Sequence, residues 1–215
     1  MITPLKPPDL VWPGSGVPRT LGQVHMSELR DAAMPKKHKE QPAPDDGLGP
    51  VWNLDLCAEI GFMLEDALEA SLKSRMGQVA EAGKAPSLEG AERPGEIELD
   101  GVLASPDLVH WGNEILHEIK FRWAKMPDSV EELEAKHQPV LYQIKTYLHI
   151  LNTVFGGEWK CVLWVLWARG DYFKRPGPVL RPYLIEYSKA ELEKFWEVWV
   201  VRERDKLLKG EKNAG

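Results

Sequence analysis

The chain has 215 residues, of which 43% are hydrophobic and 28% charged, and its formal net charge is −6. This length is enough for one sizeable domain with a true core. The acidic balance counts against a protein that coats DNA through many phosphate contacts. No apolar run approaches the roughly 20 residues that a membrane helix needs, and no signal-peptide pattern opens the chain. We therefore expect a cytoplasmic protein without a membrane partner.

The first third of the chain reads as an arm followed by a helix. Residues 1–50 are rich in Pro and Gly, which predicts an extended N-terminal arm with one short helix near residues 26–33. Apolar residues then recur at helical spacing over residues 52–76. Glu65 shares a face of this helix with Leu68, so it is a carboxylate at the edge of the packed stripe.

Strands and helices alternate over the rest of the chain. The expected strands cover residues 97–103, 108–111, 114–123, 159–168 and 179–187, and the expected helices cover residues 139–152 and 189–209. This order predicts an α/β or α+β fold with a central mixed sheet flanked by helices. We assign residues 51–210 to this domain and residues 211–215 to a charged tail.

Three ionisable side chains lie in the strand-like region. Asp100 ends one apolar run, and Glu118 and Lys120 fall inside a later one. Side chains alternate along a strand, so Glu118 and Lys120 point the same way, and Asp100 in the adjacent hairpin arm can lie beside Glu118. Neighbouring carboxylates repel unless a cation lies between them, and Mg²⁺ or Mn²⁺ suits such oxygen ligands, with the Ile119 carbonyl as another. The alternative is an ordinary surface ion pair between Glu118 and Lys120.

Two residues on the next expected helix extend this pattern. Gln143 and Tyr147 are four apart and share one helix face. With Asp100 and the tripeptide Glu118-Ile119-Lys120, they make a set that resembles the PD-(D/E)xK nuclease superfamily, in its branch of RecB-like, Cas4-like and phage exonucleases with a QxxxY motif. The order of elements over about residues 52–168 also resembles the core of that family.

The resemblance implies a restriction-endonuclease-like core and a metal-dependent nuclease that hydrolyses phosphodiester bonds of DNA. An exonuclease of the phage or recombination-repair type is the expected activity, with Mg²⁺ or Mn²⁺ as cofactor and DNA as partner. Analogy with phage exonucleases also allows a homo-oligomer. The implied roles are metal binding for Asp100, Glu118, Ile119 and Glu65, catalysis for Lys120 together with these carboxylates, and phosphate binding or orientation of the site for Gln143 and Tyr147.

Two departures from the family pattern leave alternatives open. The aspartate of the family often follows a proline, but Leu99 precedes Asp100, so Pro106-Asp107 is the alternative placement. The chain has only Cys57 and Cys161, so the iron–sulfur cluster of Cas4-type members is not expected. Other functions also stay open: a non-catalytic relative that binds DNA or protein, a structure-specific endonuclease, or a structural domain with accidental matches.

Overall fold

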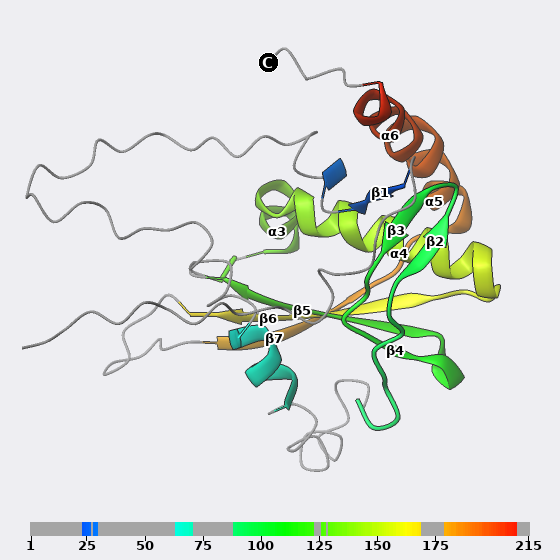
Figure 1. Cartoon of the computed structure of the whole chain (residues 1–215). Helices are drawn as coiled ribbons and strands as arrows, with labels where there is room; N and C mark the ends of the chain where they lie inside the picture. The colour runs from blue at the N-terminus through cyan, green and yellow to red at the C-terminus, as the bar shows by residue number, and fades with distance from the viewer. Residues whose placement is uncertain are drawn as a thin grey trace, which may run out of the picture.

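The computed structural model describes residues 23–26, 28–29, 63–70, 88–122, 126–127, 129–168 and 179–209. The larger of two sheets contains, in this order, β4 (Leu108–His110), β5 (Ile115–Arg122), β6 (Lys160–Trp167) and β7 (Val179–Ile185) (Figure 1). The β5–β6 pair is parallel and the other two pairs are antiparallel. A mixed sheet flanked by helices confirms the predicted fold class.

A smaller sheet has the order β1 (Val24–His25), β3 (Val102–Ala104), β2 (Ile97–Leu99). The prediction of one continuous strand over residues 97–103 is wrong, because Leu99 pairs with Val102 across a two-residue turn. Asp100 and Gly101 form this turn with φ angles of 50° and 77°. Asp-Gly is a favoured pair for such turns, since both central residues need a positive φ. The chain therefore reverses at Asp100, and the strands expected over residues 97–123 are divided between two sheets.

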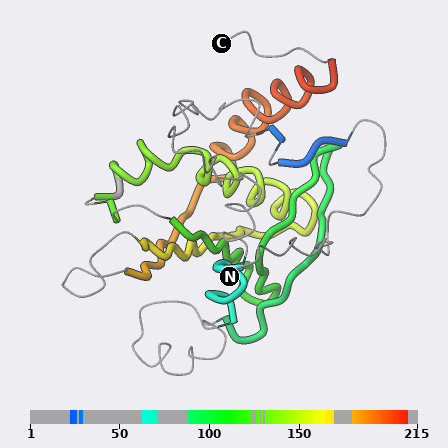
Figure 2. The backbone as a smooth tube through the Cα atoms, turned by 60° about the vertical axis from the view of Figure 1, so that its left-hand side comes forward, coloured from blue at the N-terminus to red at the C-terminus, as the bar shows by residue number. Residues whose placement is uncertain are grey.

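Part of the predicted N-terminal arm belongs to the core. Val24 and His25 pair in parallel with β3, and Met26 and Leu29 are buried among hydrophobic side chains. Figure 2 shows β1 beside the β2–β3 hairpin and near the C-terminal helices. The predicted short helix begins here, since Met26 and Leu29 are helical. The rest of residues 1–50 lies outside the described residues, so the domain boundary at residue 50 stays a prediction.

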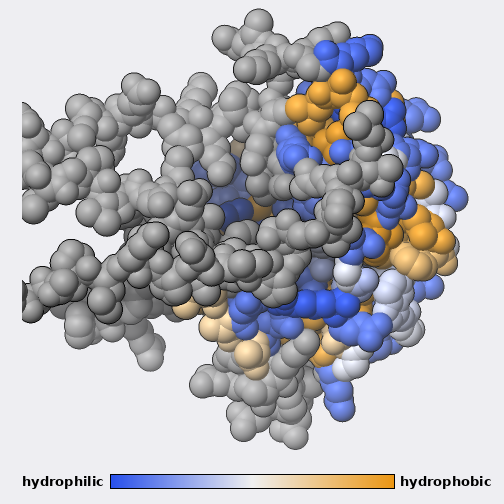
Figure 3. Space-filling model, viewed as in Figure 1, coloured by the Kyte–Doolittle hydropathy of each residue, from blue (hydrophilic) through white to orange (hydrophobic). Residues whose placement is uncertain are grey.

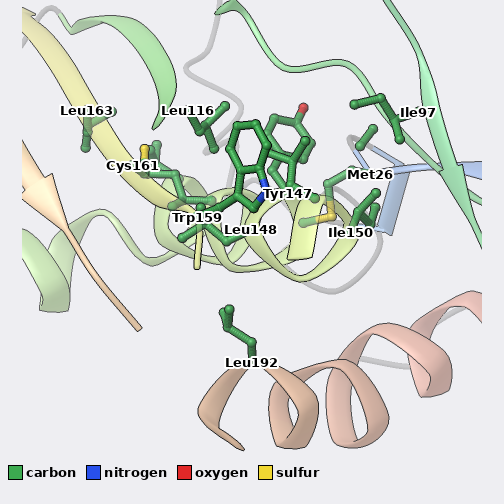
Figure 4. Close-up of a cluster of buried hydrophobic side chains, with 14 of the residues drawn as sticks. Met26, Ile97, Leu116, Tyr147, Leu148, Ile150, Trp159, Cys161, Leu163 and Leu192 are labelled. Atoms are coloured by element: carbon green, nitrogen blue, oxygen red, sulfur yellow. The ribbon is translucent and has the colours of Figure 1, made fainter. Parts of the chain in front are cut away.

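The main core lies between helix α4 (Gln138–Phe155) and one face of the larger sheet. Leu148 and Ile150 of α4 belong to one buried cluster with Leu116 of β5 and Cys161 of β6, and Ile150 lies beside Met26 (Figure 4). Pro139 stands in the first turn of α4, where its missing N–H costs nothing. Helix α3 (Val130–Lys136) precedes α4 and is capped by the Ser129 side chain. This packing fixes α4 against the strand that carries Glu118.

The opposite face of the sheet is also covered. Residues 63–70 form a helix, in agreement with the predicted helix of residues 52–76, whose other positions lie outside the described residues. Leu68 of this helix packs against a second cluster that contains Ile119 and Trp164. Glu65 thereby comes to the edge of β5.

The C-terminal segment is one continuous helical rod, as predicted. It consists of α5 (Lys189–Phe195), the π-helical turn η2 (Trp196–Val200) and α6 (Val201–Leu208). Ser188 and Glu191 form the predicted capping box. The visible surface of the described residues in Figure 3 is mostly hydrophilic, with hydrophobic areas that include the region of α6. None of the helices that the structure describes is long and apolar enough to cross a membrane.

The connection from α4 to β6 offers a test of the packing. Gly157 has a φ of 90°, and a Cβ there would lie 2.6 Å from the carboxyl carbon of Glu114. That carboxylate accepts a hydrogen bond from the Glu158 N–H. We expect Gly157→Ala to lower the free energy of unfolding by about 1–2 kcal/mol, because it adds backbone strain and displaces Glu114. Gly156→Ala is the matched control, since Gly156 has a similar φ of 74° but open space around it. Equal losses in urea unfolding would contradict the steric explanation.

Candidate active site

Strand β5 is longer than its neighbour β4, so part of the β5 edge on that side has no paired strand in the described part of the chain. The candidate site lies along this part of the edge. β4 pairs with β5 only from Ile115 to His117. No described strand pairs with this edge beyond His117, and carboxylates bind its N–H groups instead. The Ile119 N–H donates to Asp107 Oδ2 at 2.7 Å, and the Phe121 N–H donates to Glu65 Oε1 at 3.1 Å. Because the N–H and C=O of one strand residue point to the same edge, the Ile119 carbonyl also faces these carboxylates.

Glu118 and Lys120 lie on the face of β5 that α4 covers. The predicted alternation places them together, and Lys120 Nζ is 2.6 Å from Glu118 Oε1 and 3.8 Å from Asp107 Oδ2. The Glu118 side chain is fully buried, and that of Lys120 is 12% exposed. A carboxylate without solvent depends on its protein partners for stabilisation.

Gln143 and Tyr147 reach Glu118 from α4. Gln143 Nε2 donates to Glu118 Oε1 and to the Tyr147 hydroxyl, both at 2.9 Å. Tyr147 is only 2% exposed, and its binding of a substrate phosphate stays a prediction. Its contact with Gln143 fits the other expected role, orientation of the site. The one-turn spacing of the two residues on α4 makes this arrangement possible.

The charges of the site are unbalanced. Burial, and after it the charge of the Asp107 carboxylate, raise the pKa of Glu118 in opposition to Lys120, and the net pKa is about 8. Burial also raises the pKa of Glu65, against the nearby charge of Lys120. Burial alone would lower the pKa of Lys120, but the charges of the three carboxylates outweigh it and keep the ammonium protonated. Lys120 is the cation that acts most strongly on Glu118, and the charge of Arg122 also acts on Glu65.

This imbalance predicts that the stability of the metal-free protein falls as the pH rises. The folded state binds the Glu118 proton more tightly than the unfolded state does, so the stabilisation is complete below the ordinary value of 4.5 and is lost as the pH rises through about 8. We expect the free energy of unfolding in EDTA to fall by on the order of 1–3 kcal/mol more between pH 5 and pH 8.5 in the wild type than in Glu118→Gln. Urea unfolding at both pH values measures this difference, and groups common to both proteins cancel. Parallel pH profiles would contradict it.

The donor atoms fit a hard divalent cation. Glu118 Oε2 is buried and has no hydrogen-bond partner among the described residues, and such an atom is costly unless a ligand satisfies it. Asp107 and the Ile119 carbonyl supply further oxygens on the adjacent edge. The described His, Cys, Asp and Glu side chains form no ready-made group of three metal ligands. Mg²⁺ needs no such group, because one or two carboxylates with other oxygens and water suffice.

The structure does not bring Asp100 to this site, so the prediction that it lies beside Glu118 is wrong. Asp100 is exposed in the β2–β3 turn, where its carbonyl accepts a hydrogen bond from Arg204 Nη1 at 2.6 Å. Asp107, the alternative candidate, lies near Glu118 and Lys120 instead. The Pro-Asp order was the sequence signal for it, together with its place directly before the strand that pairs with β5.

Comparisons with known proteins support the fold. No protein-family model matches the sequence, and no curated protein is similar to it. A phage-related exonuclease from Haemophilus somnus 129PT is structurally similar, with a TM-score of 0.50 and 12% identity over 87% of this chain and 96% of that one. An alkaline exonuclease from Laribacter hongkongensis has a TM-score of 0.40 and 18% identity over 90% of this chain and 94% of that one. The chain thus shares the restriction-endonuclease-like fold of the phage-related exonuclease.

Proposed function

We propose that this chain is a divalent-metal-dependent nuclease that hydrolyses phosphodiester bonds of DNA. The observation that carries the proposal is the fully buried Glu118, whose Oε1 is held by Lys120 and Gln143 while its Oε2 lacks a partner among the described residues. Asp107 and Glu65 lie on the same strand edge. A buried carboxylate beside two further carboxylates is costly for stability, and a divalent cation would offset that cost.

We assign the cation to Asp107, Glu118 and the Ile119 carbonyl. When bound, Mg²⁺ or Mn²⁺ supplies positive charge to the phosphate and promotes deprotonation of water. Gln143 keeps Glu118 Oε1 occupied, so that Oε2 is the atom available to the cation. Buried Tyr147 holds Gln143 in this orientation. Glu65 Oε1 accepts from the Phe121 N–H, and the role we propose for this carboxylate is to accept a hydrogen bond from water bound to the cation.

Lys120 is the catalytic residue in this proposal. Its ammonium contacts Glu118 at 2.6 Å and lies 3.8 Å from Asp107, so it stands between both carboxylates. From this position, it can donate a hydrogen bond to a phosphate oxygen and stabilise the negative charge that develops there. A lysine can also exchange a proton with water, whereas an arginine remains protonated.

We further propose that the enzyme acts as an exonuclease. The named activity of the Haemophilus somnus protein supports this mode, because the two chains match over most of both lengths. Its DNA specificity, its place in phage recombination or repair and a homo-oligomeric state remain predictions from the family resemblance.

One assay tests the reaction and its mode. Linear duplex DNA and covalently closed circular DNA are incubated with the protein in Mg²⁺, Mn²⁺ or EDTA, with Glu118→Ala as the matched control. We expect nucleotide release from linear DNA only, in metal only, and not by the variant. Cleavage of the circle would indicate an endonuclease. No metal-dependent cleavage of either substrate would favour a non-catalytic relative.

A further inference from the structure

The loop that carries Asp107 is short and stiff. β3 ends at Ala104 and β4 begins at Leu108, so Ser105, Pro106 and Asp107 alone join the two sheets. Pro106 fixes its own φ and restricts the backbone of Ser105. A displacement of Ser105 is therefore transmitted to Asp107 rather than absorbed by the loop.

A segment far away in the sequence contacts this loop. His25 Nε2 lies at a hydrogen-bond distance of 3.0 Å from Ser105 Oγ. His25 is held in place by the pairing of β1 with β3 and by its own N–H, which donates to Glu28 Oε2 at 2.9 Å. Met26 and Leu29, at 1% and 0% exposure, anchor the same segment in the core. These contacts fix the backbone of His25, from which its ring reaches Ser105.

The other side of Asp107 is fixed by β5. Its Oδ2 accepts from the Ile119 N–H, and the next residue, Leu108, pairs with His117. Asp107 is therefore held between β5 on one side and the loop that contacts His25 on the other. Mg²⁺ tolerates little deviation from octahedral geometry, so small shifts of a ligand weaken binding.

We propose that His25 is a positioning residue for the metal site, acting through Ser105 on Asp107. The inference rests on the proposed function, which assigns Asp107 to the cation. It adds that His25, in a segment that the sequence assigns to an arm, sets the affinity of the site for a divalent ion.

The test measures Mn²⁺ affinity by isothermal titration calorimetry in full-length His25→Ala, Ser105→Ala and the double variant. We expect each single variant to bind Mn²⁺ about 10-fold more weakly, as is typical for residues that orient a metal ligand. The double variant should be no weaker than either single one, because both remove the same hydrogen bond. His25→Gln keeps a hydrogen-bonding group and should recover part of the affinity.

Gln23→Ala is the matched control, because Gln23 flanks the same strand and donates to Glu98 of β2 at 2.6 Å. It should leave Mn²⁺ affinity unchanged. Thermal unfolding in EDTA checks the fold, and Ser105→Ala, which removes only a hydroxyl, serves if His25→Ala fails to fold. Three results would overturn the inference: wild-type affinity in Ser105→Ala, additive losses in the double variant, or an equal loss in Gln23→Ala.

Different results would contradict the proposed function and the role of His25. If the wild type binds no Mn²⁺, or if Glu118→Ala binds it equally well, the metal site itself is wrong and the role of His25 is overturned with it. If the wild type binds Mn²⁺ through Glu118 and Ser105→Ala binds it as tightly, only the role of His25 is overturned.

Discussion

Replacing Asp107 with Asn is expected to reduce metal-dependent DNA cleavage by about 100-fold or more, while Asp100→Asn leaves it within about twofold of the wild type. The amide oxygen introduced by Asp107→Asn would still accept the hydrogen bond from the Ile119 N–H, so the change removes a charge with little effect on the strand edge. Asp100 lies in the β2–β3 turn and contacts Arg204 only through its carbonyl. Initial rates on linear duplex DNA at saturating Mg²⁺ measure both effects.

The pair of variants is well matched structurally. Both replace Asp by its neutral isostere, and Asn is favoured in the positive-φ turn that Asp100 occupies. Thermal unfolding of the two variants in EDTA should therefore show folded proteins. The reverse result, with Asp100→Asn inactive and Asp107→Asn active, would show that the short connection between the sheets does not supply the metal ligand.

Lys120→Ala is expected to separate metal binding from catalysis. Removing the ammonium leaves Glu118 without its 2.6 Å ion pair, so the carboxylates should attract Mn²⁺ at least as strongly as in the wild type. Cleavage should nevertheless fall by about 10²–10⁴-fold, the range typical of a lost acid–base or charge-stabilising group. Calorimetry of Mn²⁺ binding and single-turnover cleavage measure the two quantities on the same protein.

Lys120→Arg distinguishes two explanations of such a loss. An arginine retains the positive charge but cannot share a proton near neutral pH. Recovered activity in Lys120→Arg would assign Lys120 to charge stabilisation alone, and continued inactivity would favour proton exchange. A fully active Lys120→Ala would remove Lys120 from the chemistry altogether.

Local patterns in the sequence were sufficient for several parts of this fold. The apolar spacing of α4, the apolar run of β6 and the capping box at Ser188 are all local signals, and the structure follows them. The same alternation rule placed Glu118 and Lys120 together. The resemblance to the QxxxY branch, not a local pattern, is what linked Gln143 to them.

Other parts depended on contacts that local patterns do not encode. Leu99 and Val102 continue an apolar pattern through the Asp-Gly turn, so the hairpin was mistaken for one strand and Asp100 for the site residue. The two-residue strand β1 has no periodicity, and its pairing with β3 spans more than 70 residues of sequence. The burial of Tyr147 follows from the packing of α4 on the sheet, and the motif spacing alone could not distinguish it from a surface tyrosine.

The edge of β5 beyond β4 has a consequence for the solubility of variants. An open strand edge with unpaired N–H groups is a template on which a second chain can add a strand and aggregate. Asp107 and Glu65 occupy the Ile119 and Phe121 N–H groups with charged side chains, which another backbone can displace only at a large electrostatic cost. The carboxylates assigned to the chemistry thereby also protect the sheet from self-association. Truncation of both to alanine should promote aggregation, so Asn and Gln replacements are the informative ones at this edge.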